Sequence, residues 1–339
     1  SSGIFKEVKT NIKNLNNESV DIEIDVKEQP TGAISAGLGV GSSGASVSAG
    51  ISEKNLFGKA INVSSNISLG TENIKGNILT SIPDFNNTDN VLLYNLFATS
   101  TDFENAGYES SVVGNSLAIK YDLYEDITFK PGIGIDLDSI DTNSTASNLY
   151  RNREGDYFTF QTFYNLETDK RDRRFQTTKG YRVNFGQNLA LPGSDIPYIE
   201  NNISGTFYHP INEDYILSLK SGLSSINALN NKDVKLSDRK FLSSRNLRGF
   251  ENYGVGPKDG KDHIGGNYFA YSSIASTIPN PLPDKWNANS IVFLDAGNVW
   301  GVDYDSSKDS DKIRSSAGLG LDWISPLGPL SFVFAQTLS

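Results

Sequence analysis

The chain has 339 residues, no cysteine, two histidines and a formal net charge of −10 at pH 7. The lack of cysteine excludes disulfides and thiolate sites, two histidines argue against a histidine-based metal site, and the acidic balance argues against nucleic acid as a partner. Only 37% of the residues are hydrophobic, and no window approaches the ~20 apolar residues of a membrane-spanning helix. The low hydrophobic content does not exclude a membrane β-barrel, because alternate residues of its strands face water.

The first 29 residues differ from those that follow. Apolar and acidic residues alternate from Val20 to Val26, which is typical of a half-buried strand, and Glu7 to Lys13 reads as another strand. We interpret residues 1–29 as the end of a small α+β domain, bounded by Pro30, which has no N–H to donate to a ladder. The chain lacks an initiator methionine and a signal peptide, so we expect a mature or trimmed piece of a longer protein.

From Thr31 onward the hydrophobic period stays at two. In Leu117–Leu123, for example, large apolar residues alternate with Ala118, Lys120 and Asp122. Turn clusters rich in Gly, Asn, Ser and Asp separate successive segments. We therefore expect about fifteen strands, which begin near residues 31, 45, 60, 75, 90, 109, 126, 156, 179, 198, 214, 265, 287, 313 and 328.

This pattern fits either a soluble β-sandwich or propeller, or a transmembrane β-barrel. Strands of soluble folds usually have ~5–6 residues, whereas many segments here run to ~9–11 residues, the length a tilted strand needs to cross a bilayer. Tyr and Phe recur near segment ends, as in an aromatic girdle, and charges such as Lys120 and Arg182 fall on the polar phase. These features favour the closed membrane barrel, in which no strand leaves its backbone unpaired in lipid.

The longest gap between predicted strands is the loop 227–264. Loops of this length inside a compact fold are uncommon and usually functional. At its centre Arg248 and Phe250 flank Gly249. A loop that folds back into a polar lumen can place its arginine against a wall carboxylate in a planar, bidentate contact. Asp295 and Asp322 have the inward phase for this role, although each can equally be a solvated lumen carboxylate, and the loop an ordinary surface loop.

No catalytic set emerges from the sequence. His209 ends a predicted strand and His263 lies in a turn, and neither has the context of a nucleophile elbow. The glycines of Gly37–Gly41 lack the Lys-Ser/Thr and the following helix of a phosphate-binding loop. We therefore expect no enzyme, no cofactor and no metal.

Several segments, taken together and in order, resemble one family. Over essentially its whole length the chain is similar to the BamA family, the central components of the bacterial outer-membrane β-barrel assembly machine. Each motif alone is weak, and Thr177 stands where the family usually has proline, but the joint order is specific. The matching segments are Val26–Gly32, Asn55–Gly58, Asp169–Gly180, Leu247–Phe250 with Gly256-Pro257, Phe293–Trp300 and Ser325–Leu330.

The resemblance implies a fold and a location. The fold is an all-β, sixteen-stranded type of transmembrane antiparallel barrel, with about fifteen strands present here and the last one missing. Residues 1–29 are then an α+β remnant of the last POTRA domain, and residues 30–339 are the barrel. The implied location is the outer membrane of a Gram-negative bacterium, with the N-terminal part in the periplasm.

The resemblance also implies a role for the long loop. Arg248, with Gly249 and Phe250, becomes the anchor of the sixth extracellular loop inside the lumen, and Asp295 falls on one of the family's partner positions. The family's other carboxylate falls in Ser272–Ser276, which contains no acid. Asp322 is the remaining candidate for a second partner.

The implied function is that of an insertase or foldase, which receives unfolded barrel proteins and assembles them at a lateral seam. Client strands are expected to pair at this seam by β-augmentation. A strand rich in glycine and serine has weak register, which suits an openable edge, although small residues can also serve packing alone. Implied partners are unfolded outer-membrane proteins, accessory assembly lipoproteins and outer-membrane lipid, and no nucleic acid. The expected seam residues are Gly32, Ala33, Ile34, Ser35, Ala36, Gly37, Leu38 and Gly39.

Two other functions remain open at this point. One is a translocation barrel of the same superfamily, either TamA-like or a two-partner secretion transporter. The other is a passive porin, which needs neither a loop with Arg248 at its tip nor a periplasmic module.

Overall fold

The structure is a computed structural model of the chain. It describes residues 4–16, 19–41, 44–103, 107–143, 146, 148–279, 282–283, 286, 288–325 and 328–339. The helical elements that lie wholly within these residues are short turns, namely α1 (Asn148–Arg151), η1 (Phe85–Asn87), η2 (Leu236–Asp238) and η4 (Ser306–Lys308). No helix in the described part of the chain has the length and apolar character needed to cross a membrane.

The dominant element is one antiparallel sheet, which has fifteen strands within the described residues. The strands follow chain order, and each is hydrogen-bonded to the next. The predicted all-β class and the predicted number of strands are confirmed. The strands are β3 (Gly32–Gly41), β4 (Gly44–Leu56), β5 (Ile61–Gly70), β6 (Asn73–Ile82), β7 (Val91–Phe103), β8 (Tyr108–Tyr124), β9 (Ile127–Thr142), β10 (Gly155–Asp169), β11 (Gly180–Ala190), β12 (Tyr198–Pro210), β13 (Ile216–Ala228), β16 (Tyr268–Ile278), β17 (Ala288–Trp300), β18 (Arg314–Ser325) and β19 (Gly328–Thr337).

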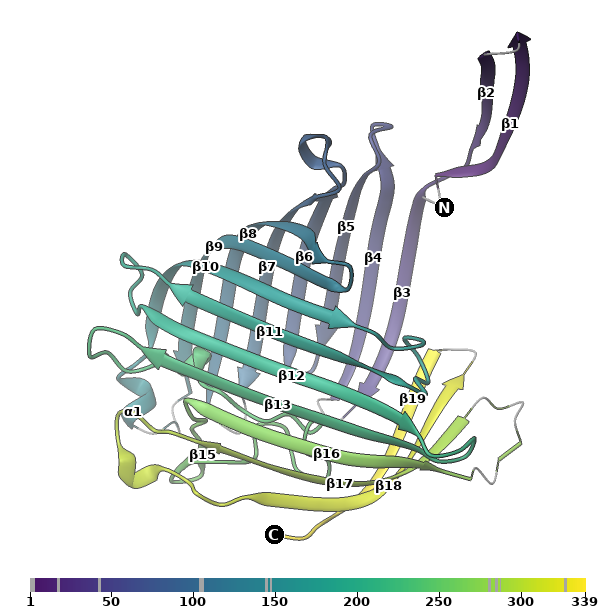
Figure 1. Ribbon diagram of the computed structural model, residues 1–339. Helices are drawn as coiled ribbons and strands as arrows, with labels where there is room; N and C mark the ends of the chain where they lie inside the picture. Colours follow the sequence, from purple (N-terminus) through teal and green to yellow (C-terminus); the bar gives the residue numbers. More distant parts are fainter. Residues whose placement is uncertain are drawn as a thin grey trace.

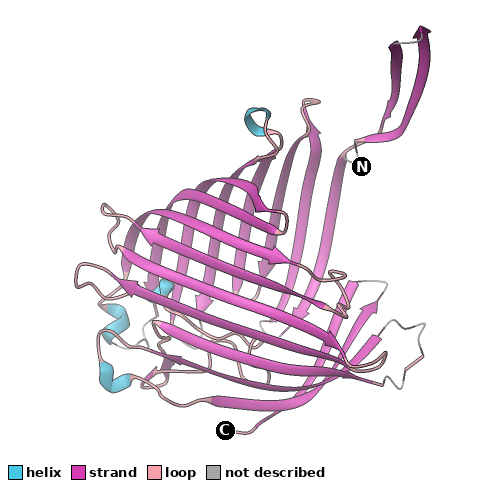
Figure 2. Cartoon of the chain, viewed as in Figure 1, coloured by secondary structure: helices cyan, strands magenta, loops and turns pink. Residues whose placement is uncertain are grey.

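The sheet curls around an interior into which the chain between β13 and β16 folds (Figure 1). Figure 2 shows that nearly all of the wall is strand. The two edges of the sheet are β3 and β19, and no ladder joins them among the described residues. In an antiparallel sheet with an odd number of strands, the first and last strands run in the same direction. Among the described residues, β3 pairs with β4 alone and β19 pairs with β18 alone.

Side chains alternate between the interior and the outer face of the wall, as the period of two requires. In β17, Phe293 and Asp295 are buried, whereas Val292 and Leu294 are 41% and 48% exposed. The outer face carries many such exposed apolar side chains, among them Leu219. An apolar surface of this extent is typical of strands that face lipid, and it disfavours the soluble sandwich or propeller.

The described part of residues 1–29 forms a hairpin of its own, which projects from the start of β3 (Figure 1). It consists of β1 (Phe5–Asn16) and β2 (Ser19–Glu28), so both predicted strands are confirmed. The pairs Val8–Val26 and Ile12–Ile22 put apolar residues on one face, where each of the four is more than half exposed. The described residues of this segment contain no helix.

Candidate functional site

The loop between β13 and β16 spans residues 229–267 and is displaced by a few residues from the predicted range 227–264. At its C-terminal end Gly265 has a φ of 62°, and Gly266 pairs with Lys240 instead of with β13. The two backbone hydrogen bonds of this bridge measure 2.7 Å and 3.0 Å. The bridge closes residues 241–265 into a sub-loop, the inner loop, which contains the small hairpin of β14 (Lys258–Asp259) and β15 (Asp262–His263).

Arg248 at the tip of the inner loop binds the carboxylate of Asp295 on β17. Its Nε lies 2.8 Å from Oδ2 and its Nη2 lies 2.7 Å from Oδ1, and the Arg248 backbone N–H donates to Oδ2 at 3.1 Å. Asp295 is 0% exposed and the Arg248 side chain is 18% exposed. The contact is thus a bidentate, charge-assisted pair with little access to water, which is the strong form of such a pair.

Local packing orients both side chains of this ion pair. Asp295 points inward because its neighbours Leu294 and Ala296 occupy the outer phase of β17. A carboxylate so buried needs a cation and further donors, since an unpaired buried charge is strongly unfavourable. The guanidinium carbon of Arg248 also lies 3.4 Å from the ring centroid of Phe293, so the plane of the cation is supported by an aromatic face.

Ser273 on β16 occupies the place of a second partner. Arg248 Nη2 donates to Ser273 Oγ at 2.8 Å, and Ser273 is 8% exposed. Asp322 does not take this role, because no hydrogen bond or ion pair between described residues joins it to Arg248. It lies six residues beyond Ser316 on β18, or about 20 Å further along the strand at ~3.3 Å per residue. The side chain of Arg248 therefore has one carboxylate partner and one hydroxyl partner.

Gly249 brings the tip against the last two strands. Its φ is 88°, a left-handed conformation that favours glycine. A Cβ atom on Gly249 would lie 3.0 Å from the Cβ of Ala335 on β19 and 3.6 Å from the Cβ of Ser316 on β18. Ser316, which is fully buried, donates its hydroxyl to the Arg248 carbonyl. The tip therefore contacts the edge strand β19 from inside the barrel.

An apolar cluster fills the space between the inner loop and the wall. Loop residues Leu242, Leu247 and Val255 are buried together with the wall residues Tyr271 and Val299, and Phe250 and Phe269 pack against this cluster. The side chain of Lys220 on β13 donates to Asn246 Oδ1 at 2.8 Å. Sequence reasoning named Leu247, Phe250 and Val299 within motifs but did not predict this cluster, although Tyr271 and Val299 carry the inward phase of their strands.

The predicted seam residues Gly32–Gly39 lie on β3, the edge of the sheet opposite to β19. They pair on one side only, with β4. Ile34 and Leu38 are each 86% exposed on the outer face. A Cβ atom on Gly37 would lie 2.8 Å from the hydroxyl of Ser48 on β4, so close packing is one physical reason for a glycine there.

The two histidines lie in separate environments. His209 on β12 stacks on Phe207 with ring centroids 6.4 Å apart. His263 in the inner loop has a buried Nδ1 without a hydrogen-bond partner, and burial, with help from Lys258 and Arg314, lowers its pKa to about 4. In the part of the chain that the structure describes, no group of three or more His, Cys, Asp or Glu side chains is placed to hold a metal ion.

A curled antiparallel wall with an apolar outer face, and a long loop tied inside it by a buried ion pair, defines a plugged barrel of the transmembrane type. The sequence profile of the Omp85 superfamily domain matches residues 55–339, and the chain belongs to this superfamily.

Two BamA proteins are similar to nearly the whole of this chain. The outer membrane protein assembly factor BamA of Neorickettsia risticii is 29% identical over 346 residues, which cover 99% of this chain and 46% of that protein. BamA of Neisseria meningitidis is 24% identical over 371 residues, which cover 95% of this chain and 46% of that protein. The chain therefore spans about half the length of these curated relatives.

Solved structures agree with the fold. The crystal structure of BamA from Haemophilus ducreyi lacking POTRA domains 1–3 superposes with a TM-score of 0.91 at 27% identity, over 99% of this chain and 73% of that one. CdiB from Acinetobacter baumannii superposes with a TM-score of 0.59 at 13% identity, over 99% of this chain and 62% of that one. The second likeness concerns the fold alone.

Proposed function

We propose that this chain is the membrane part of an outer-membrane protein assembly factor, which receives unfolded β-barrel proteins from the periplasm and inserts them into the outer membrane. The observation that carries the proposal is the tip of the inner loop, which is tied to Asp295 and lies against the edge strand β19. The similarity to BamA proteins over nearly the whole chain supports it.

The mechanism we propose uses strand pairing and needs no covalent step. The free edge of β3 presents backbone N–H and C=O groups that can pair with an incoming strand by β-augmentation. In lipid each unsatisfied backbone group costs several kcal/mol, so a client strand that pairs at the edge enters the bilayer at a much lower free-energy cost. Residues Gly32–Gly39 are the proposed pairing segment, and outer-membrane lipid is the surrounding medium.

The N-terminal hairpin supports the proposed division into domains. We assign residues 1–29 to the end of the last POTRA domain, in the periplasm, and residues 30–339 to the barrel. The apolar face formed by Val8, Ile12, Ile22 and Val26 is exposed, as expected of two strands whose covering layer lies elsewhere in a longer protein. Accessory assembly lipoproteins are the proposed further partners.

The packed inner loop is unfavourable for a passive porin. A porin needs an open water-filled lumen, whereas here Leu242, Leu247 and Val255 are buried in contact with the wall. The likeness to CdiB is one of fold and adds no support for a transporter.

The test is the Arg248→Ala variant of the whole protein, in cells depleted of the wild-type copy. We expect the yield of folded client barrels to fall at least fivefold, while the variant itself remains folded in the membrane. Arg245→Ala is the matched control, because Arg245 is a cation of the same loop whose side chain is exposed. Normal client assembly by Arg248→Ala, or high steady conductance of the wild-type barrel, contradicts the proposal.

A further inference from the structure

The loop is attached to the barrel at a second place, remote from Arg248. Residues 233–240, which we call the lead-in segment, precede the inner loop. The segment buries two apolar side chains, Val234 and Leu236, each 1% exposed. All of its charged residues take part in ion pairs, namely Asp233, Lys235, Asp238, Arg239 and Lys240.

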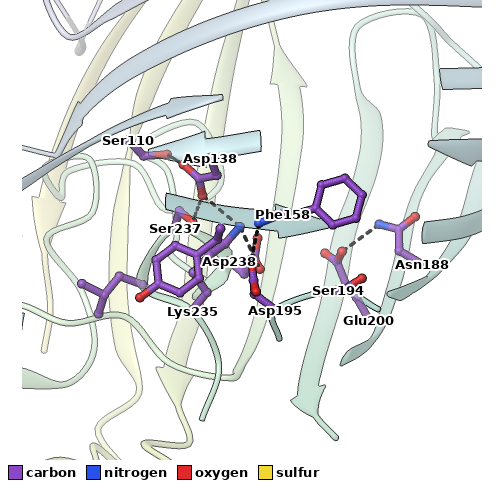
Figure 3. A network of polar contacts seen from close by, with 12 residues as sticks. Ser110, Asp138, Phe158, Asn188, Ser194, Asp195, Glu200, Lys235, Ser237 and Asp238 are labelled. Atoms are coloured by element: carbon purple, nitrogen blue, oxygen red, sulfur yellow. Dashed lines mark hydrogen bonds and ion pairs between the residues drawn. The ribbon is translucent and has the colours of Figure 1, made fainter. Parts of the chain in front are cut away.

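The most buried of these pairs joins Lys235 to Asp138 on β9. Lys235 Nζ lies 2.9 Å from Asp138 Oδ2, and the two side chains are 4% and 1% exposed. Figure 3 shows Asp138 between Ser110 of β8 and the lead-in residues Lys235 and Ser237. Ser110 donates to Asp138 Oδ1 at 2.8 Å and Ser237 donates to Oδ2, while Asp238 Oδ2 lies 3.6 Å from the same ammonium. Both oxygens of the buried carboxylate are satisfied, so removal of one partner leaves an expensive unpaired group.

The neighbouring pairs tie the lead-in segment to other parts of the wall. Arg239, whose side chain is fully buried, pairs with Asp303 in the β17–β18 loop. Asp303 also accepts hydrogen bonds from Val234 N at 2.7 Å and from Asn267 Nδ2 at 3.2 Å. Lys240 pairs with Glu200 on β12. With Asp138 on β9 and Arg153 just before β10, the segment is held by ion pairs from four separate parts of the barrel.

The lead-in segment also determines where the inner loop starts. Its last residue, Lys240, forms the backbone bridge with Gly266 that closes the inner loop. Leu236 is fixed as well, because the hydroxyl of Tyr108 donates to its carbonyl at 3.0 Å and its side chain belongs to one buried apolar cluster with Ile140 and Ile264. Any movement of the segment is therefore passed on to the base of the loop that carries Arg248.

We propose that Lys235 and Asp138 are positioning residues for the loop tip: their buried ion pair fixes the lead-in segment, and thereby the base from which Arg248 reaches Asp295. The lead-in segment keeps its own ion pairs to Asp138, Asp303 and Glu200 when the Arg248 pair is broken, so we expect it to stay in place, whereas the tip starts from the place that the segment fixes. The importance of this placement for client assembly rests on the proposed function; the placement itself can be measured without any client.

The test is hydrogen exchange, followed by mass spectrometry, of the whole protein in membranes. In Lys235→Met and in Asp138→Asn we expect amides of residues 243–254 to exchange at least tenfold faster, while the strands keep their protection. Asp138→Asn preserves the shape of the buried side chain and covers the case in which Lys235→Met fails to fold. Asp233→Asn is the matched control, since its pair with Arg153 lies at a side chain that is 40% exposed. It should change exchange at the tip by less than twofold.

A double variant separates charge pairing from packing. Lys235→Met combined with Asp138→Asn removes both charges of the pair, and we expect exchange at the tip to be no faster than in the single variant that exchanges faster. Arg248→Ala should accelerate exchange at the tip but leave residues 233–240 protected. Unchanged exchange at the tip in folded Lys235→Met and Asp138→Asn, or defects that simply add in the double variant, overturns the proposal. Normal client assembly by Arg248→Ala would instead count against the proposed function and leave the exchange result standing.

Discussion

Gly249 of the inner loop lies against Ala335 of the edge strand β19, so closely that a Cβ atom on the glycine would stand 3.0 Å from the Cβ of the alanine. The two residues are far apart in the sequence, and they meet because Arg248 ties the tip to Asp295, two strands away from β19. The loop therefore supports from inside a strand that, among the described residues, pairs with β18 alone. This contact joins the long loop directly to one end of the described sheet.

We predict that Gly249→Ala loosens the tip. An alanine at a φ of 88° is strained, and left-handed geometry costs roughly 1–2 kcal/mol for a residue with a Cβ atom. The close approach to Ala335 adds to this cost. Proteolysis of the loop in membranes should become severalfold faster. Gly76→Ala in β6 is the control, because a Cβ there meets nothing within 4 Å; equal effects of the two changes would contradict the prediction.

We predict that Asp295→Asn releases the tip more strongly than any change at Ser273. The variant leaves the guanidinium of Arg248 in a site with 18% exposure and no counter-charge, and breaking a buried pair in this way costs about 3–5 kcal/mol. A cysteine placed at Phe250 should then react much faster with a maleimide in folded barrels.

Asp322→Asn is the comparison for that experiment. Asp322 is exposed and has no hydrogen bond or ion pair to Arg248 among the described residues. We expect the Asp322→Asn change to alter the free energy of releasing the loop tip from the wall by less than about 0.5 kcal/mol, as for most surface substitutions. Similar labelling rates for the two variants would show that Asp295 is not the anchor.

Acidification should loosen the inner loop through His263. Burial lowers the pKa of His263 to about 4 from an ordinary value of 6.5, and Lys258 and Arg314 act in the same direction. Between these two values the released loop binds a proton that the packed loop does not, so the stability of the packed loop is lost as the pH falls from 6.5 to 4. Hydrogen exchange of residues 258–266 should accelerate over this window in the wild type and much less in His263→Gln. An identical pH profile for both would rule out His263 as the cause.

The sequence predicted the wall of the barrel better than it predicted the contacts inside the barrel. A period of two predicts strands and their facing, and so it identified Asp295 as an inward carboxylate. Ser273 carries no comparable signal, because a serine on the polar phase of a strand has no preferred partner. The pairs Gly249–Ala335 and Lys235–Asp138 each join distant segments, and their distances depend on how the sheet curls. The start of β16 was placed a few residues too early, since the Lys240–Gly266 bridge is non-local and leaves no local pattern.

The central claim, that the free edge of β3 receives client strands, is tested most directly by site-specific photo-crosslinking. A photoreactive residue replaces Leu38 on β3 or, as the control, Ile67 on β5; both side chains are exposed on the outer face, but β5 is paired on both sides. We predict that a newly synthesised client barrel crosslinks to position 38 during assembly and not to position 67. Equal crosslinking at both positions, or none at position 38 while clients are being assembled, would contradict the account.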